Sequence, residues 1–328
     1  MAPPDPPGGA KGALLALVAF AIFATHDVIV KYLGASYSPI QIVFFSVLFS
    51  FPFLSFSLVQ QKDEGDLRPR HVWWTVARTI AAVTTGLMAF VAFANLPLAQ
   101  VYAILFAAPL FITLFAIPLL GEQVGWRRGL AVLVGLGGVL VVLQPFGQTL
   151  SWGHAAAFVA AMCGAFASVV VRKIGRDERA VVLILMPLMT NFVLMGAALV
   201  FVYEPMPVID LGASAVMSLL ALVATACLIG AYRQAPAAIV APMQYSQIIW
   251  ASLYGALFFN EGLTRDTLIG TGIIVASGLY IVLREARGGR SATTPVLRTR
   301  SRLGTPSAPR IAPFVKPDAP PDKTDDAP

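Results

Sequence analysis

Two stretches of the sequence decide the fold. One runs from Leu96 to Glu122 and reads LPLAQVYAILFAAPLFITLFAIPLLGE; the other runs from Ala235 to Glu261 and reads APAAIVAPMQYSQIIWASLYGALFFNE. Each is as long as the helix that crosses about 30 Å of hydrocarbon. The two share residues at identical spacing, with Pro97, Ala99, Val101 and Glu122 matching Pro236, Ala238, Val240 and Glu261. The chain therefore contains an internal repeat.

The composition excludes a water-soluble globule. Of 328 residues, 57% are hydrophobic and 12% are charged, against about 45–50% apolar and about 25% charged in soluble domains. Both cysteines, Cys163 and Cys227, lie in apolar runs, so we expect neither a disulfide framework nor a metal site. No cofactor is implied. The net charge of +6 comes from loop and tail arginines, which does not indicate a nucleic-acid surface.

Apolar runs recur along the whole chain and predict an all-α integral membrane protein with ten transmembrane helices. A β-barrel is excluded, because these runs are twice as long as a barrel strand and their apolar and polar residues do not alternate. We expect the spans at 12–33, 39–59, 73–94, 97–119, 126–143, 152–171, 180–203, 211–231, 236–259 and 265–283.

The spans divide into two copies of five. We expect an N-terminal tail at 1–11, a first repeat at 12–143, a linker at 144–151, a second repeat at 152–283 and a disordered tail at 284–328. Because five is odd, the second copy enters the membrane from the opposite side, and the repeats are inverted. Many secondary transporters have this arrangement, because exchanging the conformations of the halves moves a central cavity from one side to the other.

Lysine and arginine residues are concentrated in the even-numbered connections between spans. Arg68 and Arg70 lie in the second connection, and Arg172 and Lys173 lie at the sixth, whereas the odd connections are nearly free of cations. The positive-inside rule predicts that both termini are cytoplasmic, and the protein is expected in the cell inner membrane.

The two quoted stretches, with FATHDVIVKYLG from Phe23 to Gly34, resemble the EamA-type family of the drug/metabolite transporter superfamily. The resemblance covers residues 12–283 and implies a ten-span transporter that binds a small-molecule substrate. Similar proteins move amino acids, S-adenosylmethionine, riboflavin and other organic solutes. The second repeat departs from the pattern at Asn260, where the first has Gly121.

Asp27 is the carboxylate that lies well inside a span, beside His26. A desolvated carboxylate or imidazole can titrate near neutral pH, so the pair is a candidate for binding a proton or a substrate amine. The alternative is an interfacial pair between Asp27 and Lys31, one helical turn further along. Both interpretations stay open.

Other polar and aromatic residues inside the spans are candidates for the substrate site. Arg78 either closes the cytoplasmic side or binds an anionic group. In the ninth span, two glutamines and two aromatic residues form a stripe that either lines a cavity or packs. The candidates on the fourth and ninth spans are Tyr102, Phe106, Gln244, Tyr245, Gln247 and Trp250, and the predicted helix kinks are at Pro109 and Pro242.

Two glutamates end the quoted stretches, and glycines follow in the next spans. We expect Glu122 and Glu261 to cap the helix that comes after each. Gly135, Gly138, Gly272 and Gly278 suggest close helix packing, either within the monomer or in a homodimer.

A secondary transporter of a small organic metabolite, such as an amino-acid derivative, is the leading interpretation. A riboflavin or S-adenosylmethionine importer is the runner-up within that class. An enzyme is not expected, since the chain has no HExxH motif, no second membrane aspartate and no Gly-x-Ser-x-Gly elbow. A membrane scaffold or lipid scramblase is the alternative from another class.

Overall fold

The computed structural model describes residues 9–60, 68–121, 126–143, 151–175, 177–235 and 237–287, and its regular elements there are all helices. The helices are α1 (Gly9–Gly34), α2 (Pro39–Gln60), α3 (Val72–Asn95), α4 (Leu98–Leu105), α5 (Ala108–Leu120), α6 (Trp126–Leu143), α7 (Trp152–Ile174), α8 (Ala180–Val202), α9 (Val208–Gln234), α10 (Ala237–Val240), η1 (Ala241–Ser246), α11 (Gln247–Phe259) and α12 (Arg265–Arg287).

These helices form the ten predicted spans. The fourth span consists of α4 and α5, and the ninth of α10, η1 and α11. Six of the described helices, with α4 and α5 taken as one, are long and apolar enough to cross a membrane, and α2 and α6 contain shorter apolar stretches. Glu122, residues 1–8, most of the predicted linker and the tail beyond 287 lie outside the described residues.

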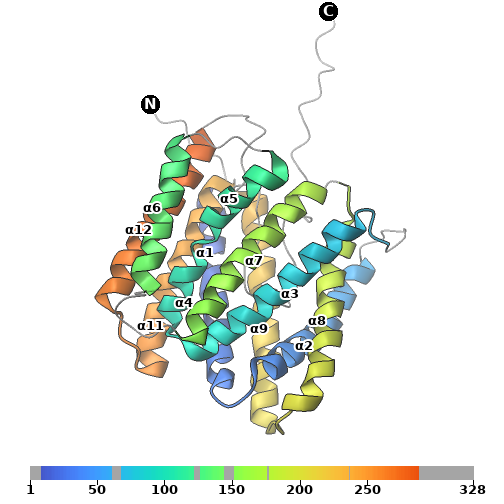
Figure 1. Cartoon of the computed structure of the whole chain (residues 1–328). Coiled ribbons are helices and arrows are strands. Elements are labelled where there is room, and N and C mark those ends of the chain that lie inside the picture. The colour runs from blue at the N-terminus through green and yellow to red at the C-terminus, as the bar shows by residue number, and fades with distance from the viewer. Residues whose placement is uncertain are drawn as a thin grey trace, which may run out of the picture.

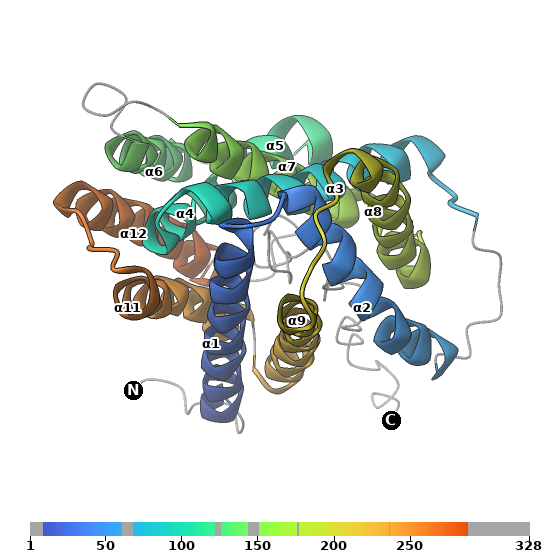
Figure 2. The ribbon, with the colours of Figure 1, turned by 90° about the horizontal axis from the view of Figure 1, so that it is seen from below.

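The second half repeats the packing of the first. The third span packs along the sixth (α3 on α7), and the eighth packs along the first (α9 on α1), as a two-fold relation between the halves requires. The fifth and tenth spans (α6 and α12) lie side by side, as do the second and seventh (α2 and α8), which Figures 1 and 2 show on opposite flanks of the molecule. The largest interfaces therefore cross between the halves.

Both broken spans change direction beside a predicted kink. Residues 106 and 107 interrupt the fourth span just before Pro109, and a 3₁₀ segment that contains Pro242 interrupts the ninth. Proline at a helix start leaves no helical hydrogen bond unmade, so the new segments begin there without penalty. The rings of Phe106 and Tyr245, which are equivalent in the two repeats, meet with centroids 5.1 Å apart. The two-fold axis therefore passes between them.

The two broken spans also end in the same way. Gly121 after α5 has φ 68°, and Asn260 after α11 has φ 54°. Both residues adopt the left-handed conformation that ends a helix, and asparagine is among the few residues that tolerate it. The Asn260 substitution thus preserves the loop geometry of the repeat.

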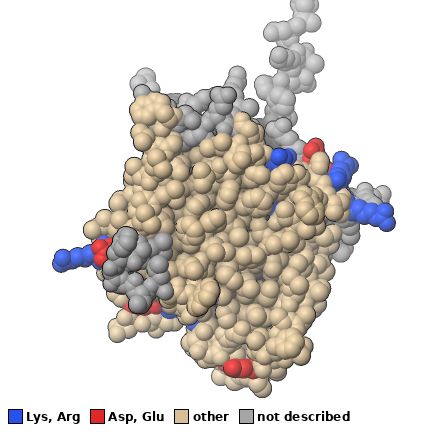
Figure 3. Space-filling view, viewed as in Figure 1, with Lys and Arg blue, Asp and Glu red and all other residues tan. Residues whose placement is uncertain are grey.

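The outer surface is apolar. The face in Figure 3 has its charged side chains around the rim and other residues across its broad middle. Trp73, Trp126 and Trp152 are 81%, 71% and 86% exposed at the first turns of α3, α6 and α7. Exposed tryptophans at helix ends are typical of the membrane–water interface. The chain is an integral membrane protein.

The glycines of α6 and α12 pack within the monomer. A Cβ at Gly138 would lie 3.0 Å from the Gly270 carbonyl oxygen, and one at Gly270 would lie 2.7 Å from the Gly138 carbonyl oxygen. A Cβ at Gly135 or Gly278 would also overlap side chains of the same chain, whereas Gly272 faces open space. The close approach of these two helices explains Gly138 and Gly270, and a homodimer stays a prediction.

Arg78 is buried at 2% exposure, and its guanidinium Nη1 donates a hydrogen bond to the carbonyl oxygen of Leu183. Four residues after Leu183 comes Pro187, inside α8. Since proline has no N–H, the Leu183 carbonyl has no helical donor. Arg78 supplies that donor from the other half of the molecule, and its two predicted roles both stay predictions.

We expect Arg78→Ala to lower the free energy of unfolding by about 1.5–3 kcal/mol, the value of a hydrogen bond that involves a charged group. In a Pro187→Ala background the backbone supplies the missing N–H, so the same substitution should cost clearly less. Unfolding in detergent of the parent protein, the two single variants and the double variant gives the coupling energy between Arg78 and Pro187. An equal cost in both backgrounds would contradict the account.

Candidate functional site

A chain of buried hydrogen bonds begins at His26 and Asp27, which are 0% and 1% exposed on α1. His26 Nδ1 lies 2.7 Å from Asp27 Oδ1, and the Tyr102 hydroxyl donates to Asp27 Oδ2. The Gln247 amide donates to the Tyr102 hydroxyl over 3.3 Å. We call His26, Asp27, Tyr102 and Gln247 the Asp27 cluster. It joins α1 to both broken spans.

The helix breaks position this cluster. Tyr102 belongs to the short helix α4, and Gln247 is the first residue of α11, directly after the 3₁₀ segment. Phe93 and Phe106 contact the Tyr102 ring with centroids 5.6 and 6.0 Å away. The polar groups therefore lie in an aromatic environment, beside the Phe106–Tyr245 contact on the two-fold axis.

The second ring nitrogen of His26, Nε2, is not part of the hydrogen bond to Asp27. When Nδ1 carries the hydrogen that Asp27 accepts, Nε2 of the neutral ring is an acceptor. Nε2 is buried and, among the described residues, has no hydrogen-bond partner. A buried polar atom of this kind is costly, and it is a place where a proton or a ligand donor can bind.

Lys31 has a different partner from the one in the alternative prediction, which paired it with Asp27. Its ammonium lies 2.7 Å from Glu261 Oε1 and donates to the Leu96 carbonyl over 2.6 Å. The other oxygen of Glu261 accepts the Leu98 N–H at 3.0 Å. The carboxylate thus caps α4 in the first half.

The predicted cap of the following helix by Glu261 is therefore corrected. At the start of α12 the Thr264 hydroxyl accepts the Thr267 N–H at 3.2 Å. A cap by a neighbour in the sequence was the simplest expectation, and the fold brings the carboxylate to a helix start far away along the chain.

The predicted stripe of the ninth span separates into different environments. Gln247 is 3% exposed and joins the Asp27 cluster, whereas Gln244 lies half-buried in the 3₁₀ segment. Trp250 stacks on Tyr254 with centroids 6.2 Å apart. The Tyr254 hydroxyl lies 3.2 Å from the Thr25 hydroxyl, a second polar contact between α1 and α11 that the sequence pattern did not indicate.

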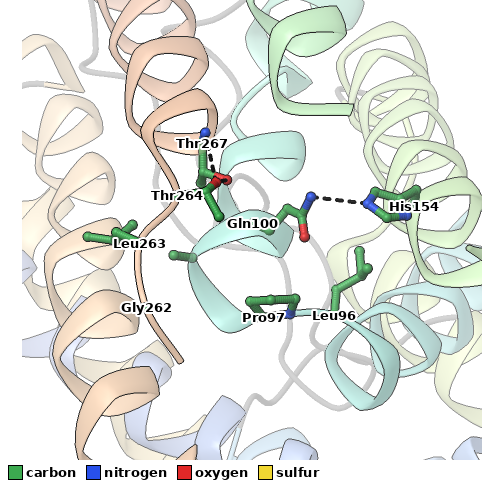
Figure 4. Close-up of a pocket in the computed structure, with 9 residues that line it drawn as sticks. Leu96, Pro97, Gln100, His154, Gly262, Leu263, Thr264 and Thr267 are labelled. Atoms are coloured by element: carbon green, nitrogen blue, oxygen red, sulfur yellow. Dashed lines mark hydrogen bonds between the residues drawn. The ribbon is translucent and has the colours of Figure 1, made fainter. Parts of the chain in front are cut away.

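A cavity of about 250 Å³ opens near the start of α4 (Figure 4). Gln100 and His154 face each other across it, with Nε2 atoms 3.0 Å apart. Ser151 and His154 form a capping box at the start of α7, with histidine at the position where the sequence signature has glutamate or glutamine. The residues that line the cavity are Leu96, Pro97, Ala99, Gln100, His154, Gly262, Leu263, Thr264 and Thr267.

The end of the molecule that contains this cavity is the Lys31 face, defined by the connections at 35–38, 96–97, 203–207 and 260–264. Two further contacts join the halves there. Gln41 donates to the Glu204 carbonyl at 2.7 Å and accepts the Glu204 N–H at 2.9 Å. The Tyr37 hydroxyl donates to Asp210 at 2.6 Å, and this hydrogen bond is the main cause that raises the pKa of Tyr37 to about 12.

The opposite face has its own contacts between the halves. Lys173 donates to the Leu119 carbonyl at 2.7 Å and lies 4.5 Å from the centroid of the Trp74 ring. His71 lies 3.4 Å from Asp177. Across the described ranges, His, Cys, Asp and Glu form no group of three that could bind a metal ion.

Known proteins match nearly the whole chain. The model of the EamA-like transporter family matches twice, at residues 10–144 and 151–283. A riboflavin transporter of Rhizobium johnstonii is 28% identical over 295 residues, covering 87% of this chain and 95% of that protein.

Two further relatives carry other names. An S-adenosylmethionine uptake transporter of Rickettsia prowazekii is 26% identical and covers 84% of this chain and 92% of its own length. A pseudopaline exporter of Pseudomonas aeruginosa is 25% identical and covers 85% and 98%. A crystal structure at 18% identity, with a TM-score of 0.56 over 85% of this chain and 99% of its own, has the same fold.

Proposed function

Because the chain belongs to the EamA-like transporter family, we propose that it moves a small organic metabolite across the inner membrane by alternating access, with the Asp27 cluster as its central site. The observation that carries the proposal is the position of this cluster. It lies where α1 meets both broken spans, next to the two-fold axis. Inverted-repeat transporters bind their substrates at discontinuous helices between the repeats.

The charges of the cluster favour a substrate with an amine. Asp27 is its formal negative charge, and Arg78, the cationic candidate, donates instead to a backbone carbonyl of α8. A buried carboxylate among aromatic rings suits a cationic or zwitterionic amphipathic solute. An amino-acid derivative meets these requirements, as does an S-adenosylmethionine-type metabolite. Riboflavin, which has no amine to pair with Asp27, is the second candidate within the class.

Proton coupling is the second part of the proposal. The Asp27 carboxylate has a donor on each oxygen, and His26 Nε2 has a free acceptor position. A proton or amine that binds to the pair competes with the Tyr102 hydroxyl for Asp27. Tyr102 is on α4, so its release frees one end of a broken span. Occupancy of the site is thereby linked to the position of a helix.

The expected orientation places the Lys31 face outside the cell. Arg68, Arg70 and Lys173 are exposed on the opposite face, which supports a cytoplasmic location for that face and for both termini. Among the described residues, the Lys31 face has fewer cations. One of them is Arg265, the first residue of α12, which directly follows the connection at 260–264.

Flux through the purified protein in liposomes tests the proposal. Under an imposed pH gradient we expect uptake of a labelled amino-acid derivative or S-adenosylmethionine. Asp27→Asn and Tyr102→Phe should each lower the rate roughly 10- to 100-fold, since a hydrogen bond to a charged group is worth about 1.5–3 kcal/mol. Asp27→Asn should also remove the dependence on the gradient.

Gln247→Ala and Gln244→Ala form a matched pair for the same assay. Gln247 belongs to the Asp27 cluster, so its loss should slow flux, whereas Gln244→Ala should leave the rate near that of the parent. Unchanged flux and pH dependence in Asp27→Asn would refute the coupling role. Phospholipid flipping without solute flux would favour a scramblase.

Cysteine labelling checks the orientation. In a chain carrying Cys163→Ala and Cys227→Ala, Gly262→Cys should react with a membrane-impermeant thiol reagent added to intact cells. Arg70→Cys should react only after the cells are permeabilised. Both positions are exposed, so reactivity reports sidedness and not burial. The reverse pattern would place the termini outside.

A further inference from the structure

Two layers of contacts connect α1 with α4. In the inner layer, Asp27 accepts the Tyr102 hydroxyl hydrogen bond. In the outer layer, Lys31 pairs with Glu261, which accepts the Leu98 N–H. Lys31 follows Asp27 by one helical turn, and Leu98 precedes Tyr102 by one turn, so both layers use the same faces of the two helices. The layers are therefore about 5.4 Å apart along the helix axes.

The outer layer borders the cavity of Figure 4. Leu96, whose carbonyl accepts from Lys31, lines the cavity, and so does Gly262, the residue after Glu261. Pro97, directly before α4, lines it as well. The cavity and the ion pair therefore adjoin at the start of α4, and the Asp27 cluster lies one helical turn further along α4.

We propose that the Lys31–Glu261 ion pair is the gate between the cavity and the Asp27 cluster, and that it opens when α4 tilts at its break. The proposal rests on the proposed function in taking the cavity as the outer end of the substrate path. In the present structure the gate is closed.

The chemistry of the pair suits a gate. The Lys31 and Glu261 side chains are only 13% and 17% exposed, and the ammonium lies 5.3 Å from the centroid of the Phe259 ring. The attraction of such a pair is offset by the loss of hydration of both charges. Opening readmits water to both charges, so separating the pair costs less free energy than its Coulomb attraction alone.

The gate is mechanically tied to the site. One helix, α4, is bound at its first residue to Glu261 and one turn later, through Tyr102, to Asp27. Two residues outside regular helix, Phe106 and Ala107, separate α4 from α5 and provide a hinge. A ligand that displaces Tyr102 from Asp27 removes the inner of these two contacts and leaves the outer one, at the gate, in place.

Cysteine accessibility tests the gate without any substrate. In the background without native cysteines, Ala99→Cys reports the cavity, and Ala103→Cys reports the position one turn deeper on the same face of α4, where the parent residue is 0% exposed. An impermeant thiol reagent is added from the Lys31 face. We expect the deeper cysteine to react at least 10-fold faster in Glu261→Gln and in Lys31→Gln, with the cavity cysteine nearly unchanged.

Lys173→Gln is the matched control. Lys173 also donates to a backbone carbonyl and lies on an aromatic ring, but at the opposite face. It should leave the labelling of both reporters unchanged. The double exchange of Lys31→Glu with Glu261→Lys should restore slow labelling of the deeper reporter only in part, compared with the two glutamine variants. A lysine at position 261 cannot accept the Leu98 N–H.

Three results would overturn the gate: unchanged labelling of Ala103→Cys in both glutamine variants, equal acceleration by Lys173→Gln, or acceleration of both reporters alike. None of them depends on transport. Liposomes without flux for any metabolite would count against the proposed function and leave the labelling result standing. Normal flux with unaltered labelling would count against the gate alone.

Discussion

Backbone polar groups inside hydrocarbon must find partners within the protein, and this constraint shapes the molecule. An unbroken helix meets it alone, but the fourth and ninth spans are interrupted and α8 contains Pro187. At Pro187 and at the first turn of α4, a side chain from the other half supplies a partner. Arg78 reaches the Leu183 carbonyl, and Glu261 reaches the Leu98 N–H. Each of these two contacts satisfies a backbone group of one half with a side chain of the other, and both contacts hold the two repeats together.

The architecture was predictable because its determinants are local. Twenty apolar residues specify a span, and a repeated pattern of proline and glutamate specifies a second copy. The residues in contact across the halves were not predictable. From the sequence, the visible neighbour of Lys31 is Asp27, one turn away, whereas its partner Glu261 comes from the other half. Likewise the 3₁₀ segment separates Gln244 from Gln247, which an unbroken helix would place together.

The repeat also separates scaffold from chemistry. The packing of α3 on α7 recurs as that of α9 on α1, so the two halves are built alike. The positions of His26 and Asp27 correspond to Ala167 and Ser168, and the Ser168 hydroxyl donates to the Gly164 carbonyl of its own helix. A carboxylate in only one copy gives the centre a single ionisable pair, which the proposed alternating access would present to either side of the membrane.

The contact between Phe106 and Tyr245 has one further consequence. The rings meet at 81°, edge against face, although they are equivalent in the two repeats. An edge-to-face pair is never symmetric, since one ring must present its rim and the other its π-cloud. In the proposed alternating-access cycle the halves exchange conformations, and the two rings would exchange these roles. Only one of them carries a hydroxyl, so the two arrangements are chemically different and need not have equal free energies.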